Sequence, residues 1–127
     1  MTFYSDEINR IKKALYPHDD LTQQIIAAKL YIDKHFADRI GLDDTARKAH
    51  VSRFHFIRLF KKYYGRTPHQ YLQEVRIDNA KKLLQKGRSI DDACLSVGFT
   101  SKTSFISLFK KLTGTTPNQY QKRNSHP

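Results

Sequence analysis

The 127-residue sequence has few cysteines, tryptophans, glycines and prolines. It contains one cysteine, no tryptophan, five glycines and four prolines. A single cysteine excludes an internal disulfide and suits a reducing compartment such as the cytoplasm. No apolar run approaches the roughly 18 residues of a membrane span. Residues 1–6 also lack the pattern of a secretory signal peptide. These absences favour a cytoplasmic domain held together by a hydrophobic core.

Acidic residues are scarce in one part of the chain only. Residues 1–50 contain eight Lys and Arg against eight Asp and Glu, whereas residues 51–127 contain fifteen against four, so the whole net charge of +11 lies there. A concentrated positive field suits a polyanionic partner, because each neutralised phosphate releases condensed counterions. Charge alone leaves nucleic acid and an anionic membrane surface as rival partners.

Patterns typical of enzymes and metal sites are missing as well. The sequence has no Gly-rich phosphate loop and no nucleophile elbow. The acidic pairs Asp43-Asp44 and Asp91-Asp92 both stand at expected helix starts, where favourable contact with the helix dipole explains them. The histidines do not form a ligand set, and Cys94 fits a small core residue. We therefore expect no catalytic site, no metal and no cofactor.

A long internal repeat is the strongest feature of the sequence. Residues 52–62 and 101–111 share a leading Ser, then Phe-Ile and Leu-Phe-Lys-Lys, at an offset of 49. Residues 65–71 and 114–120 continue the match with Gly, Thr-Pro and Gln-Tyr. Upstream the offset is 48, so one extra residue entered the second copy near Thr100. Such self-similarity indicates duplication of one structural unit.

The first copy has the apolar spacing of helices. Leu21, Ile25, Ala28, Ile32 and Phe36 predict an amphipathic helix near 20–37. A short helix at about 42–49 and a bend at 50–51 follow. Ser52 then caps a helix over about 53–64, which Gly65 ends. The residues expected to face the core of this helix are Phe56, Leu59, Phe60 and Tyr63.

Thr67-Pro68-His69-Gln70 predicts the start of a longer helix that ends before Gly87, because it combines a cap, a first-turn proline and a glutamine three residues after the cap. In the second copy, Ser89 caps a short helix and Gly98-Phe99 makes a turn. Helices follow near 102–112 and after Thr116. With no alternating strand pattern, we expect an all-α fold of two homeodomain-like helix-turn-helix units. The expected segments are an extension with a possible helix (1–19), a first unit (20–70), a linker helix (71–86), a second unit (87–123) and a tail (124–127).

A short helix, a tight turn and a longer basic helix form the helix-turn-helix pattern, whose second helix lies in the major groove of DNA. Arginine can pair with guanine there, and phenylalanine or isoleucine can touch a thymine methyl. The candidates in the first copy are Ser52, Arg53, Phe54, His55, Ile57, Arg58, Lys61 and Lys62. The candidates in the second copy are Ser101, Lys102, Thr103, Ser104, Ser107, Lys110 and Lys111. The second set is more polar, so we expect it to discriminate less and to rely on phosphates.

The linker helix fits a two-groove arrangement. About 15 residues from Tyr71 to Gln85 rise roughly 22 Å, so the helix and its flanking turns suit recognition helices about 34 Å apart, one turn of DNA. One chain could then read successive grooves as a monomer, with a dimer as the alternative if it is part of a longer chain. We expect Leu83 and Leu84 to pack this helix against the units on either side. We expect Arg76, Lys81 or Lys82 to contact phosphates.

Residues 20–123 resemble the DNA-binding domain of AraC/XylS-type transcription regulators. The resemblance is carried by residues 46–52, 58–62, 65–68, Tyr71, 76–84, 97–99 and 104–117, in matching order and spacing. It implies sequence-specific control of transcription at promoter DNA, often with contact to RNA polymerase. The chain is then either a small regulator or the DNA-reading part of a longer one.

Three positions depart from the family pattern. Cys94 stands where Ala is usual, Gly41 where a Ser or Thr cap is usual, and Ser107 where a base-reading Arg is common. The last departure points to weaker specific readout by the second unit. A basic helical module for membranes or RNA is the alternative interpretation, but it would need the apolar faces that the repeat assigns to the core.

Overall fold

The computed structural model of the chain describes residues 20–41 and 52–124. Over these ranges the regular secondary structure consists of helices joined by turns, which confirms the all-α prediction. The expected helices at the N-terminus (Ile8, Ile11 and Leu15) and at 42–49, with the bend after the latter, lie outside the described residues. The helices described are α2 (Asp20–His35), α4 (Arg53–Tyr64), α5 (Pro68–Gln85), α6 (Ile90–Ser96), α7 (Lys102–Thr113) and α8 (Pro117–Asn124).

The chain divides into two compact units. Among the described residues, unit 1 contains 20–32, 41 and 52–68, and unit 2 contains 33–40 and 69–124. Unit 1 therefore holds α4 and most of α2, whereas α5 belongs to unit 2 except for Pro68. Each unit holds one copy of the repeated helix, which is α4 in unit 1 and α7 in unit 2.

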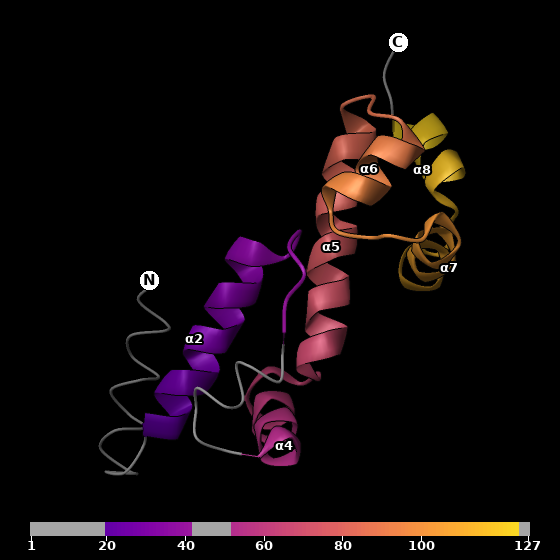
Figure 1. Ribbon diagram of the computed structural model, residues 1–127. Helices are drawn as coiled ribbons and strands as arrows, with labels where there is room; N and C mark the ends of the chain where they lie inside the picture. Colours follow the sequence, from indigo (N-terminus) through magenta and orange to yellow (C-terminus); the bar gives the residue numbers. More distant parts are fainter. Residues whose placement is uncertain (1–19, 42–51, 125–127) are drawn as a thin grey trace. The chain divides into compact units, whose positions relative to one another are not determined.

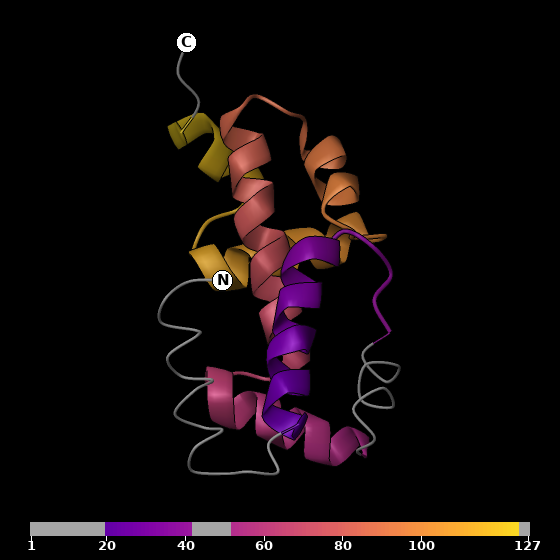
Figure 2. The ribbon, with the colours of Figure 1, turned by 90° about the vertical axis from the view of Figure 1, so that its left-hand side faces the viewer.

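Unit 1 is built on the crossing of α2 and α4. Figures 1 and 2 both place α4 across the N-terminal end of α2, where the hydroxyls of Thr22 and Tyr63 lie 3.1 Å apart. From α2, the predicted stripe residues Ile25, Ala28 and Ile32 are buried. The buried side chains of α4 are Phe56 and Phe60.

Leu59, which the sequence placed in the core of unit 1, is only half-buried. Phe56 and Phe60 lie four residues apart on one side of α4, with ring centroids 6.1 Å apart. One turn of α4 thus fills its part of the core with two aromatic rings. The remaining side chains of the helix are left at its flanks or in solvent.

The core of unit 2 contains buried side chains of α5, α6 and α7, and Tyr120 of α8 packs against them. Figure 1 shows α6, α7 and α8 around the C-terminal half of α5, and in Figure 2 α6 and α8 flank that end of α5. The ring of Phe109 lies 5.8 Å from that of Phe105 and 5.4 Å from that of Tyr120 on α8. The buried cluster consists of Ile77, Ala80, Leu84, Ala93, Cys94, Val97, Phe105 and Phe109.

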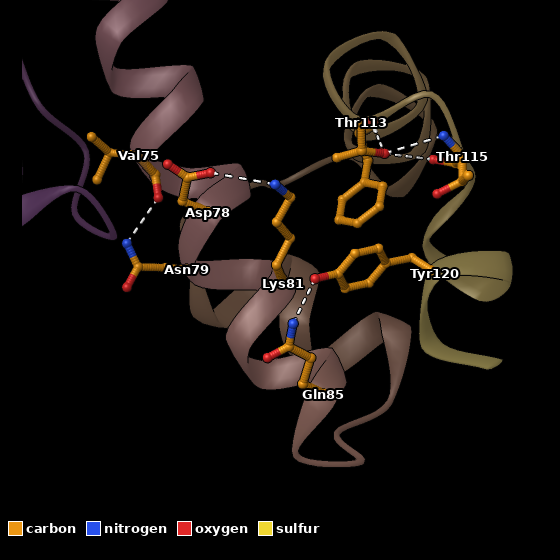
Figure 3. A network of polar contacts seen from close by, with 9 residues as sticks. Val75, Asp78, Asn79, Lys81, Gln85, Thr113, Thr115 and Tyr120 are labelled. Carbon is orange, nitrogen blue, oxygen red and sulfur yellow. Dashed lines mark hydrogen bonds and ion pairs between the residues drawn. The ribbon is translucent and has the colours of Figure 1, made fainter. Parts of the chain in front are cut away.

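Leu83 and Leu84 both pack into this cluster of unit 2. Among the described residues, both leucines thus attach α5 to unit 2. A polar contact adds to the attachment of α5 within unit 2: in Figure 3, Gln85 Nε2 donates to the hydroxyl of Tyr120 on α8 at 2.6 Å. The ion pair of Lys81 and Asp78, at 3.7 Å, lies within α5 itself. The long helix is thus part of the core of unit 2.

Arg76 on α5 ties the segment after α2 to the turn of unit 2. Its guanidinium donates to the carbonyls of Phe36 (2.7 Å) and Asp38 (3.0 Å) and lies 5.7 Å from the centroid of the Phe99 ring. Partial burial lowers the pKa of Arg76. Two donors of the guanidinium thus serve carbonyls of unit 2, which gives Arg76 a structural role there.

The turn between α6 and α7 requires glycine at one position. Gly98 has a φ of +101°, in the region that L side chains rarely adopt. A Cβ atom there would lie 2.9 Å from the backbone oxygen of Ala37 and 3.1 Å from Arg76 Nε. The predicted turn at Gly98 is confirmed, and it is tight because backbone and guanidinium approach it from within unit 2.

Candidate nucleic-acid interface

The first candidate reading helix, α4, begins and ends at well-defined caps. Ser52 has extended backbone angles, and its side chain accepts a hydrogen bond from the His55 amide at 3.1 Å. At the other end, Gly65 has a φ of +76° and donates its amide to the Lys61 carbonyl at 2.8 Å. Both caps satisfy backbone groups that a helix end leaves without partners. The predicted limits of this helix are confirmed.

The second candidate reading helix, α7, repeats these caps 49 residues later. Ser101 accepts a hydrogen bond from the Ser104 amide at 3.2 Å. Gly114, with a φ of +84°, donates to the Lys110 carbonyl at 2.8 Å. The phenylalanines of both helices occupy equivalent buried positions, since Phe105 and Phe109 match Phe56 and Phe60. The duplication thus preserved one structural frame, which consists of the serine cap, the two buried phenylalanines and the glycine at the end of the helix.

The start of α8 supplies a reciprocal capping box. The Gln119 amide donates to Thr116 Oγ1 at 3.2 Å, and the Thr116 amide donates to Gln119 Oε1 at 3.1 Å. This arrangement satisfies two backbone donors and fixes the direction in which the chain leaves α7. In Figure 3, the Thr113 hydroxyl closes the intervening turn by donating to the Thr115 carbonyl at 2.9 Å.

The face of α4 away from its buried phenylalanines is polar and basic with one large aromatic residue. Phe54, in the first turn, is 77% exposed. Ile57 is half-buried, so it borders the core more closely than the sequence-based assignment to the outer face implied. The other candidates of this copy are all exposed: Ser52, Arg53, His55, Arg58, Lys61 and Lys62.

The corresponding face of α7 carries hydroxyls and lysines. Its first two turns contribute only short polar side chains and one lysine, and its last turn contributes two lysines. All seven candidates of this copy are exposed: Ser101, Lys102, Thr103, Ser104, Ser107, Lys110 and Lys111.

One candidate, Lys102, already has an anionic partner. Its Nζ lies 2.9 Å from Asp91 Oδ1 in the first turn of α6. The hydrogen bond to Asp91, followed by the negative charge of that carboxylate, raises the pKa of Lys102. The sequence indicates only a helix-start role for Asp91, and nothing in its spacing to Lys102 predicts the pair. It depends on how α6 crosses α7.

The start of α6 agrees with the sequence-based interpretation. Ser89 accepts a hydrogen bond from the Asp92 amide at 3.0 Å, and both acidic residues lie in the first turn. Asp92 also receives a hydrogen bond from Arg88 at 2.8 Å, which together with the charge of Arg88 lowers the pKa of Asp92. The acidic pair is thus explained by capping and ion pairing.

Cys94 lies on the inner side of α6 and is 3% exposed, as predicted for a core residue. Its Sγ lies 3.9 Å from the Phe99 carbonyl oxygen, and burial raises the pKa of the thiol. Over residues 20–41 and 52–124, no group of three His, Cys, Asp or Glu could hold a metal ion. None of the helices in these ranges is long and apolar enough to cross a lipid bilayer.

Comparison with known proteins identifies the family to which this arrangement of helices belongs. A family model for a helix-turn-helix domain matches residues 45–123. An uncharacterised helix-turn-helix-type transcriptional regulator of Bacillus subtilis, YbfI, is 36% identical over 73 residues, which are 58% of this chain and 26% of that protein. The chain spans about a quarter to a third of the length of the curated relatives first matched.

Two solved structures have the same fold. An AraC-type regulator from Chromobacterium violaceum is 30% identical, with a TM-score of 0.72 over 84% of this chain and 96% of that one. The DNA-binding domain of AdpA, solved in complex with a target DNA, is 25% identical, with a TM-score of 0.73 over 78% of this chain and 90% of that one. Together with the family match over most of the chain, these similarities show that the chain belongs to the AraC-type helix-turn-helix family of DNA-binding transcription regulators.

Proposed function

We propose that the chain binds promoter DNA sequence-specifically by placing α4 and α7 in successive major grooves. The observation that carries the proposal is the repeated frame. Two helices, each with a serine cap and two buried phenylalanines, turn a basic polar face to solvent. A similar domain, that of AdpA, was solved on its target DNA. In helix-turn-helix proteins the second helix presents its N-terminal residues to base edges.

The side chains divide into base-reading and phosphate-binding groups. In α4, Arg53 and Arg58 are suited to guanine, whereas Phe54 and Ile57 are suited to a thymine methyl. In α7, the base-edge positions are Lys102, Thr103, Ser104 and Ser107. The phosphate-binding group consists of Ser52, His55, Lys61, Lys62, Ser101, Lys110 and Lys111.

The wider role is that of a promoter regulator in the cytoplasm, in contact with the nucleoid. We assign RNA polymerase as a protein partner, a monomer as the DNA-bound form of this chain, and no catalytic activity or cofactor of its own. A membrane-surface role fits the structure poorly, because an interfacial helix inserts its apolar face into lipid. Here two phenylalanines of each helix (Phe56 and Phe60 of α4, Phe105 and Phe109 of α7) are buried at 0–1% exposure, and the exposed Phe54 of α4 is surrounded by polar and basic residues.

The test is selection of bound sites from random duplex DNA, followed by titration of the selected duplex at several salt concentrations. We expect the logarithm of the association constant to fall linearly with the logarithm of salt, by about 0.9 per phosphate contact. A scrambled duplex, single-stranded RNA and anionic vesicles serve as controls. Equal binding to every duplex, or an affinity that does not respond to salt, would contradict the proposal.

A further inference from the structure

The reading helix of unit 2 begins beside a carboxylate. Lys102 is the first residue of α7 and Asp91 lies in the first turn of α6, with 2.9 Å between Nζ and Oδ1. The side chains remain 56% and 71% exposed, respectively, so solvent and a nucleic acid can reach both. The ammonium is therefore engaged by the protein at the place where a recognition helix meets DNA.

The fold does not depend on this ion pair. Ser89 caps α6 and Ser101 caps α7, and between the two helices lie the buried Ala93 and Phe105. Exposed ion pairs contribute little to stability, because solvent screens them and two side chains lose freedom. The pair is expected to matter more for what Lys102 can bind than for how the helices pack.

Carboxylates are rare in this part of the molecule. Residues 51–127 contain only Glu74, Asp78, Asp91 and Asp92 as acidic residues, against fifteen Lys and Arg. The carboxylate of one of the four, Asp91, thus lies beside the first residue of the helix proposed to enter the groove. A carboxylate there repels phosphate and also occupies the lysine that would bind it, which lowers the affinity for any duplex.

We infer that Asp91 limits the affinity of the second reading helix: it holds Lys102 in the free protein, and Lys102 exchanges Asp91 for a phosphate or base acceptor on duplex DNA. This inference rests on the proposed function. It makes Asp91 a positioning residue that acts through Lys102 and keeps the contribution of α7 to binding small.

A double-mutant cycle on one duplex tests the exchange. Affinities are measured by fluorescence anisotropy for the wild type, Asp91→Asn, Lys102→Met and the double variant, with circular dichroism and Tm as checks of folding. Asp91→Asn should tighten binding about two- to fivefold, the range expected for loss of an exposed competing ion pair. Lys102→Met should weaken binding more in the Asp91→Asn background than in the wild type, because the DNA contact is then opposed by no competitor.

Asp92 and Arg88 provide the matched control, since they form a partly exposed ion pair at 2.8 Å in the same unit and neither is a candidate DNA contact. If Asp92→Asn tightens binding as much as Asp91→Asn, the effect is one of net charge and the inference is wrong. It is equally wrong if Lys102→Met weakens binding only while Asp91 is present, because Lys102 then merely neutralises Asp91. Failure of the wild type to bind any duplex at low salt would instead overturn the proposed function, and with it this inference.

Discussion

The two capped helices of this chain, α4 and α7, share a frame and differ in the face that they turn outward. Caps and buried phenylalanines recur at equivalent positions, with serine before each helix and left-handed glycine after it. The outer positions have diverged, since Arg58 is matched by Ser107 and Phe54 by Thr103. Positions that folding requires have therefore stayed alike in the two copies, while several exposed positions in the first turns have changed; the exposed lysine pair in the last turn of each helix is kept.

This contrast implies a division of labour. α4 offers an exposed phenylalanine and the exposed Arg58, groups that distinguish base edges. α7 offers hydroxyls, lysines and one lysine already paired with Asp91, groups that favour phosphates. Unit 1 is expected to supply most of the sequence preference, and unit 2 mainly phosphate contacts that do not depend on sequence.

The largest expected effect tests whether the buried phenylalanines of α4 and α7 are equally necessary for stability. Phe60→Ala and Phe109→Ala each remove a fully buried ring and should lower the free energy of unfolding by about 3–5 kcal/mol. Urea denaturation followed by circular dichroism measures the loss and shows whether the units unfold in one transition or two. Leu112→Ala, at a position 43% exposed, is the control and should change stability much less. A loss below about 1 kcal/mol for either phenylalanine would contradict the shared frame.

The next largest effect concerns the link between the readers. Asn79 lies in the middle of α5 and donates to the Val75 carbonyl at 2.8 Å (Figure 3). Asn79→Pro removes a backbone donor and clashes one turn back, at a cost of about 3 kcal/mol or more. In a variant that circular dichroism shows to be folded, affinity for a full site should fall towards that for a single half-site. Unchanged full-site affinity would mean that α5 does not couple the units, and the two-groove arrangement would be wrong.

Alanine substitutions at equivalent positions of α4 and α7 distinguish sequence-specific contacts with bases from contacts with phosphates. Arg58→Ala should weaken binding to the best site by about 1–3 kcal/mol and relax the preference at one or two base pairs. Ser107→Ala, the equivalent change in α7, should alter the selected sequence little. Lys111→Ala should weaken all duplexes by similar factors. Site selection with each variant is the measurement, and an unchanged profile for Arg58→Ala would remove α4 from the role of main reader.

The smallest expected effect is a pH dependence confined to unit 2. The hydrogen bond from Arg88, together with its charge, holds the pKa of Asp92 below its ordinary value. This stabilisation is present at neutral pH and is lost as the pH falls from about 4 through the lowered pKa, because the unfolded chain takes up the proton first. Arg88→Ala should therefore reduce the acid-induced fall in Tm, whereas Lys86→Ala, with the same change in charge, should not. Equal acid sensitivity of both variants would contradict this assignment.

Local chemistry determined much of this molecule from the sequence alone. Serine caps, glycine ends, the Thr-Pro-x-Gln box of α8 and the spacing of the buried phenylalanines depend on neighbours within a turn or two, so the sequence predicts them well. The two sets of candidate DNA-binding residues follow from the same periodicity. Their exposure agrees with this placement, with Ile57 as the half-buried exception.

Contacts between segments distant in sequence were decided only by the tertiary structure. Arg76 looked like one more surface cation, but it donates to Phe36 and Asp38, 40 and 38 residues away. Leu83 and Leu84 enter one cluster, and Asp91 meets Lys102, because the crossing of α5, α6 and α7 brings these positions together. Helical periodicity indicates which side of a helix a residue occupies, but the packing of helices determines what that side faces.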